Sequence, residues 1–152
     1  IMIQKLIQTS SIVLFMQNHF ELVDTEFEVQ FSNCTLDASF FNHEAHLRLA
    51  WIHITKYGVN QAISNLDTQL IKYVTSLGAR NKYNKTVTIA AVKAVHHFIQ
   101  KTDSNNFKDF IKEFPRLKTN FKDLLSQHYS IDIYNSENAK SSFFEPNLLP
   151  FT

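Results

Sequence analysis

Glycine is nearly absent from this chain, and its scarcity limits the folds that are open to it. The 152 residues include two glycines, Gly58 and Gly78. Hairpin-rich all-β folds need glycine at positive φ in many of their turns, and two glycines cannot supply them. The Gly-rich phosphate-binding loops G-x-G-x-x-G and G-x-x-x-x-G-K-[ST] do not occur in the sequence either. We therefore expect an all-α fold without one of the usual nucleotide-binding loops.

Apolar residues recur at helical spacing in most of the chain, and capping residues mark the ends of these segments. The clearest segment follows Asn60, which can cap a helix whose apolar stripe runs to Gly78. Residues 27–31 alternate with a period of two but also place Phe27 and Phe31 four apart. We expect a short helix there, because no second strand candidate exists to pair with it. The spacing predicts helices over residues 3–20, 27–31, 42–57, 60–78, 86–101, 105–114 and 117–125.

The five segments after residue 41, together with the N-terminal helical segment, indicate an all-α fold, a multi-helix bundle of about five or six helices. We expect residues 1–152 to form a single helical domain in which residues 1–36 are an N-terminal helical segment. Residues 129–152 are polar and are interrupted by Pro146 and Pro150, which predicts an extended C-terminal tail that wraps around the bundle. The single cysteine, Cys34, excludes an internal disulfide.

The charge and hydropathy of the chain argue against several classes of partner. The formal net charge is +1 and the isoelectric point is near 8.0, whereas nucleic-acid-binding domains usually show a dense basic patch and a value above about 9. No segment approaches the roughly 20 apolar residues of a membrane span. The apolar run at residues 12–16 is too short for a signal sequence. We therefore expect a cytoplasmic protein with no nucleic-acid or membrane partner, and homo-oligomerisation stays open.

Histidine is enriched, with seven in the chain, and its imidazole ring can bind metal ions or exchange protons near neutral pH. On a helical wheel, His43, His46, His53 and Tyr57 share one stripe, which lies inside the apolar face of its helix. A buried polar group without a partner costs about 1–3 kcal/mol. These inward rings therefore need a hydrogen-bond partner, a ligand or a metal ion.

The opposite arc of the same helix carries charged residues. Glu44 and Arg48 are four residues apart there, and we expect them to form an i, i+4 ion pair on the surface. Such a pair contributes about 0.2–0.5 kcal/mol.

A second helix and the loop before it bring further polar residues to the bundle interior. On the helix predicted over residues 86–101, Thr88 and His96 face inward, whereas His97 lies on the polar arc. Tyr83 lies in the polar loop that precedes this helix. We expect Thr88, His96 and Tyr83 to face the histidine stripe.

Three interpretations of these residues stay open. A small-ligand pocket would be floored by His43, His46, His53 and Tyr57 and closed by Tyr83, Thr88 and His96. A metal site would use His43, His46 and His96 to hold a divalent transition metal, whose activated water would make the protein a hydrolase-like enzyme. In the third interpretation, backbone carbonyls and hydroxyls satisfy the rings in a packed interior. The sequence of residues 43–46, HEAH, is one residue short of H-E-x-x-H, so the zincin motif is absent.

Residues 41–51, FNHEAHLRLAW, fit the pattern F-x-H-x-x-H-L-x-x-A-W. This pattern resembles the signature of a small bacterial all-helical domain family of unknown function. That family also carries Y-H-E-T-x-T after its second long helix, where this chain has YNKTVT at residues 83–88. Residues 128–130 and 146–148 are similar to the family's H-Y-S and P-[DN]-L patterns. The resemblance extends from about residue 27 to 151 and implies a helical fold with a shared pocket.

This chain departs from the second motif at two positions. Where the family has histidine and glutamate, it has Asn84 and Lys85. Asparagine is a poor transition-metal ligand, and a lysine ammonium repels a cation. The family's site therefore carries over to His43, His46, Tyr83, Thr86 and Thr88.

The departures favour a small-ligand-binding protein over a metal-dependent enzyme. A protein-interaction module without a site is the rival from a third class, and its exposed phenylalanines would bind the partner.

Overall fold

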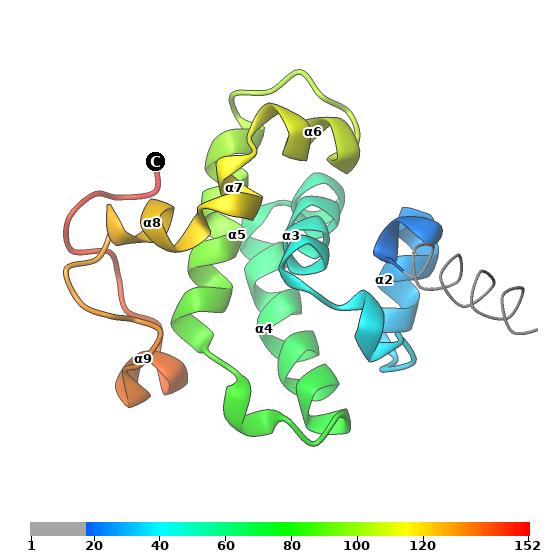
Figure 1. Ribbon diagram of the computed structural model, residues 1–152, viewed down its shortest axis with the longest axis horizontal. Helices are drawn as coiled ribbons and strands as arrows, with labels where there is room; N and C mark the ends of the chain where they lie inside the picture. Colours follow the sequence, from blue (N-terminus) through cyan, green and yellow to red (C-terminus); the bar gives the residue numbers. More distant parts are fainter. Residues whose placement is uncertain (1–17) are drawn as a thin grey trace, which may run out of the picture.

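The computed structural model describes residues 18–152, and this part of the chain is all-α (Figure 1). It contains eight α-helices and no strand, so the predicted fold class is confirmed. The helices are α2 (Asp24–Ser32), α3 (His43–Tyr57), α4 (Val59–Ser76), α5 (Lys85–Ile99), α6 (Phe107–Glu113), α7 (Arg116–Thr119), α8 (Phe121–Ser126) and α9 (Glu137–Ser141). Three short 3-10 segments, η1 (His19–Glu21), η2 (Ala38–Phe40) and η3 (Arg80–Lys82), lie between them or before them. The helix predicted over residues 3–20 lies mostly outside the described residues.

Three long helices, α3, α4 and α5, form the centre of the fold, and each packs against the other two. In Figure 1, α2 lies on one side of this centre, and α8 and α9 lie on the other. Small side chains on α5 allow the helices to approach closely, because Ala90, Ala91 and Ala94 are at most 2% exposed. The Trp51 ring on α3 packs 4.7 Å from the Phe110 ring on α6, so α6 covers a further face of α3.

One glycine joins α3 to α4. The side chain of Asn42 caps α3 by accepting a hydrogen bond from the Ala45 N–H at 2.8 Å, as the sequence predicted. Gly58, with φ 85° and ψ 163°, ends α3 and also precedes the first residue of α4. The prediction that Asn60 caps the second helix is wrong, because α4 already begins at Val59. The short connection keeps α3 and α4 side by side.

The C-terminal part differs from the prediction in two ways. The helix expected over residues 117–125 is divided at Asn120 into α7 and α8, because Asn120 leaves helical geometry at φ −142° and ψ 38°. The tail is not wholly extended, since α9 forms within it. The Ser136 side chain caps α9, and the fully buried Ala139 fixes this helix against α5.

The predicted short helix at residues 27–31 is confirmed as part of α2, and a strained residue follows it. Phe27 and Phe31 are at most 1% exposed, since a four-residue spacing puts both rings on the inner face. Cys34 lies two residues beyond α2 with φ 64°, a left-handed conformation that glycine adopts without steric cost and other residues rarely adopt.

We expect Cys34→Gly to be more stable than Cys34→Ala by about 1 kcal/mol in urea unfolding. Both variants lose the thiol, but alanine keeps the Cβ that clashes at positive φ. Equal free energies of unfolding for the two variants would show that Cys34 is not strained.

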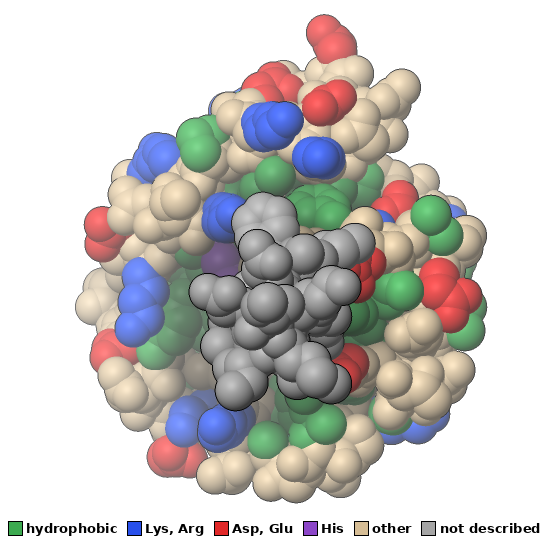
Figure 2. All heavy atoms as spheres, turned by 45° about the vertical axis from the view of Figure 1, so that its right-hand side comes forward, with side chains coloured by type: hydrophobic (Ala, Val, Ile, Leu, Met, Phe, Trp, Pro, Cys, Tyr) green, Lys and Arg blue, Asp and Glu red, His purple; other side chains and the backbone are tan. Residues whose placement is uncertain are grey.

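The described surface carries charges of both signs close together. On the face shown in Figure 2, Lys and Arg side chains are interspersed with Asp and Glu side chains around the rim. Over residues 18–152, none of the helices has the length and apolar character that crossing a bilayer requires.

Candidate functional site

The three histidines predicted to share a stripe on α3 have three different environments. His43 Nε2 lies 2.8 Å from the carbonyl oxygen of Leu117, so the ring donates to the end of α7. His53 is 1% exposed, and its Nδ1 lies 3.2 Å from the Asn65 side-chain nitrogen on α4. His46 lies beside the Phe41 ring at 6.2 Å. The stripe therefore contacts α7, the Phe41 ring and α4 in turn. The prediction that it lies wholly inside the apolar face is wrong at His43, which is exposed because it is the first residue of α3, where the neighbouring helices cover the stripe less completely.

Three polar side-chain atoms of α3 and α4 are buried and have no hydrogen-bond partner among the described residues. They are His46 Nε2, His53 Nε2 and Gln69 Oε1. The Asn65 amide oxygen accepts from Gln61 at 2.7 Å, so its amino group faces His53 Nδ1, and the proton of a neutral His53 is assigned to Nε2. The sequence predicts a partner for every inward histidine ring. Among the described residues, His46 Nε2 and His53 Nε2 have none.

Burial also changes the acid–base behaviour of these two rings. It lowers the pKa of His46 to about 4, with a smaller contribution from the neighbouring His43. Burial likewise lowers the pKa of His53, although the carboxylate of Glu28 opposes the change. Both rings are therefore neutral at pH 7 and offer one donor and one acceptor each.

Tyr57 does not form the floor of a pocket with the histidines. Its ring is 42% exposed, and its hydroxyl donates to Glu28 Oε2 at 2.6 Å. Lys56 donates to the other oxygen of the same carboxylate at 2.7 Å. The contacts of Glu28 with Tyr57 and Lys56 therefore link α2 to α3 and stabilise the fold.

The second motif, residues 83–88, anchors the tail. Asn84 caps α5 through the Val87 N–H and donates to the carbonyl oxygen of Ile133 at 2.8 Å. Thr86 donates to the carbonyl oxygen of Ser142 at 2.9 Å and accepts from the Phe144 N–H. The hydroxyl of Thr88, 3% exposed, donates to the Asn84 carbonyl at 2.7 Å. Asn84 and Thr86 therefore hold residues 133–144, whereas Thr88 bonds within the first turn of α5.

Tyr83 forms a hydrogen bond with α4. Its hydroxyl donates to the carboxylate of Asp67 on α4, and burial followed by this contact raises the pKa of Tyr83. Lys85 also contacts Asp67, at 3.2 Å. The ring lines an open cavity between η3 and α9 that contains none of the predicted histidines.

The predicted metal ligands are not gathered by the described part of the chain. Residues 18–152 contain no group of three or more His, Cys, Asp or Glu side chains that could hold a metal ion. His43 bonds to Leu117, and His96 is half-buried on α5. His43, His46 and His96 thus do not form a ligand set in this structure.

The predicted Glu44–Arg48 pair is wrong. Arg48 is 4% exposed and binds Asp24 at 2.8 Å, together with the carbonyl oxygens of His19 and Leu22. Glu44 instead contacts His19 and Lys118, each at 2.8 Å. Because η1 and α2 cover the outward arc of α3, both charged residues have partners from other segments.

The tail encloses a cavity of about 360 Å³ against α5, α7 and α8, which we call the tail cavity. Its apolar wall includes Leu124, Phe98 and Phe151. Its polar side chains come from His97, Arg116, Gln127, His128 and Thr152. His97 was expected on a solvent-facing arc, but the tail covers it. The helical wheel could not show this, because the covering segment lies more than fifty residues further along the chain.

His128 holds the tail over this cavity. Its Nδ1 donates to the carbonyl oxygen of Leu149 at 2.8 Å, and its ring stacks 4.2 Å from the Phe151 ring. The Leu148 N–H donates back to the His128 carbonyl at 3.0 Å, and the Ser130 N–H donates to Asn147 at 2.9 Å. The two weaker sequence patterns, at residues 128–130 and 146–148, thus meet here and were the available signal for this site.

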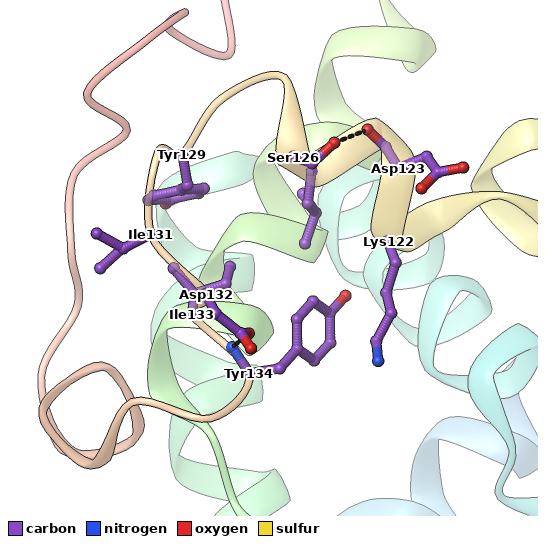
Figure 3. A pocket seen from close by; sticks show the side chains of 9 residues that line it. Lys122, Asp123, Ser126, Tyr129, Ile131, Asp132, Ile133 and Tyr134 are labelled. Carbon is purple, nitrogen blue, oxygen red and sulfur yellow. Dashed lines mark hydrogen bonds between the residues drawn. The ribbon is translucent and has the colours of Figure 1, made fainter.

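A second cavity, of about 320 Å³, lies on the other side of α8 (Figure 3). The Lys122 ammonium lies 4.8 Å from the centre of the Tyr134 ring, and burial raises the pKa of Tyr134 to about 12. Asp132 in its wall binds the Tyr134 N–H and the Asn135 amide. Ser126 donates to the backbone of Asp123. The polar side chains of Ser126 and Asp132 are therefore already engaged by α8 and by the loop that follows it.

Comparison of this chain with known proteins identified no related protein. No family model, curated protein or solved structure matches this chain. The resemblance to the bacterial helical family therefore stays a prediction from the residues alone.

Proposed function

We propose that this protein binds a small organic molecule in the tail cavity. The observation that carries the proposal is the composition of its wall, in which an apolar floor and two aromatic rings surround a few polar side chains. Ligand sites in proteins typically occupy about 300–1,000 Å³ and combine these two features. The cavity also contains His97, whose pKa is lowered mainly by burial, and perturbed histidines of this kind are common at functional sites.

The proposed function, binding of a small ligand, is the one that the sequence predicts, but the proposed site is the tail cavity and not the histidine stripe of α3. A pocket floored by His43, His46 and His53 has no support from the cavities, because none of the three described above is lined by these residues. His97 and His128 take their place. Both lie where the tail meets the bundle.

The neutral probe phenylacetamide tests this function. We expect it to shift the NMR signals of Phe98 and Leu124 with a dissociation constant in the millimolar range, which suits a ligand of about ten non-hydrogen atoms. Gln127→Phe should abolish these shifts, because Gln127 is an exposed residue in the cavity wall and a larger ring would fill the space.

The matched control is Thr68→Phe, which adds the same ring at an exposed position of α4. It should leave probe binding unchanged. Shifts that persist in Gln127→Phe, or that map to residues outside the tail cavity, would refute the proposed site.

A further inference from the structure

The charges around the tail cavity are one-sided. Arg116 lies in its wall and is absent from the ion pairs that residues 18–152 make with one another. The wall contains no Asp or Glu side chain, whereas the second cavity and the cavity beside Tyr83 each have at least one in their walls. A guanidinium is permanently charged and presents a planar set of donors that fits a carboxylate.

From this wall we infer that the natural ligand is a small carboxylate with an apolar body. Arg116 binds the carboxylate, and the apolar body lies against Phe98, Leu124 and Phe151. This inference rests on the proposed function and names the chemical class of the ligand. A monoanion fits better than a dianion because Arg116 supplies a single permanent positive charge to the wall.

His97 adds a donor when it is protonated. The groups that face it are His96 from its own helix, Lys101 from the turn after that helix, His128 from the segment after α8 and the backbone of Phe151. Arg116 from α7 lies in the same cavity wall. Burial and then Lys101 lower the pKa of His97, against a backbone hydrogen bond with Phe151 that raises it. A bound carboxylate favours the charged imidazole, so ligand affinity should rise as the pH falls towards the pKa of His97 in the free protein.

The test compares phenylacetate with phenylacetamide, two probes that differ in charge and have nearly the same shape. We expect phenylacetate to bind wild-type protein at least about fivefold more tightly at pH 7. Arg116→Met should remove this preference, so that phenylacetate binds no more tightly than phenylacetamide. Arg80→Met, which removes the same charge at an exposed arginine in η3, should keep the preference.

Two further measurements separate the alternatives. Phenylacetate should bind more tightly at pH 5.5 than at pH 7.5, with proton uptake measured by calorimetry in two buffers, and His97→Gln should reduce both effects. Equal affinities of the two probes for wild-type protein would overturn the carboxylate assignment while leaving the proposed function intact. Failure of both probes to bind would overturn the proposed function itself.

Discussion

Arg48→Met should lower the free energy of unfolding by about 3–5 kcal/mol, the largest effect that we expect from a single substitution. The guanidinium donates to Asp24 and to the carbonyl oxygens of His19 and Leu22, and it lies 4.8 Å from the Phe27 ring. Methionine fills much of the space but leaves two inward carbonyls without a donor. Removing one partner of a buried charged network typically costs this much.

The conservative variant and a surface control sharpen this prediction. Arg48→Lys keeps the charge but not the planar set of donors, so it should lose roughly half as much stability. Lys108→Met removes a charge from an exposed side chain near Phe20 and should change the free energy of unfolding by less than about 0.5 kcal/mol.

Urea unfolding followed by circular dichroism measures all three variants. Hydrogen exchange should also speed up in η1 and α2 of Arg48→Met before it changes in α5. A loss of less than about 1 kcal/mol in Arg48→Met would mean that the network around Arg48 does not hold these segments to α3.

The second large effect concerns acid stability and centres on His46. Its pKa is about 4 in the folded protein and 6.5 in an unfolded chain. Between these values the unfolded chain binds the proton more readily, so stability is complete above pH 6.5 and is lost as the pH falls towards 4. Each unit of difference corresponds to about 1.4 kcal/mol, and His46 therefore accounts for up to about 3 kcal/mol.

His46→Phe should flatten this acid dependence. The substitution should not lower the free energy of unfolding at pH 7, because the phenyl ring replaces an imidazole whose Nε2 has no hydrogen-bond partner among the described residues. His97→Phe is the matched comparison at a half-buried histidine and should flatten the curve less.

Urea unfolding between pH 4 and 8 gives the curves, and the NMR signal of the His46 ring gives its pKa directly. A His46 signal that titrates near pH 6.5 would contradict the prediction.

The helices themselves were largely readable from local sequence. Asn42 and Gly58 mark the ends of α3 because one side chain caps an N–H and the other residue adopts positive φ. Phe27 and Phe31 identified α2 as a helix because their spacing buries both rings. Asn120 was missed, since a single residue leaving helical geometry has no periodic signature.

The helical wheel did not predict the environments of the polar residues of α3 correctly. A helical wheel assumes that one arc of a helix meets the core and the other meets water. In α3, all of residues 47–54 are buried, so no solvent arc exists along this stretch. Arg48 was assigned to the surface for that reason, although η1 and α2 cover it.

The sequence by itself determined the fold class and most helix ends, because glycine scarcity, capping residues and apolar spacing act within one turn or one helix. The tertiary structure alone decided which polar residues share a space. His97 and His128 meet Arg116 because the tail, held by Asn84, Thr86 and His128, returns across α5 and α8. Contacts of this kind depend on residues about twenty to sixty positions apart in the chain, and no local pattern encodes them.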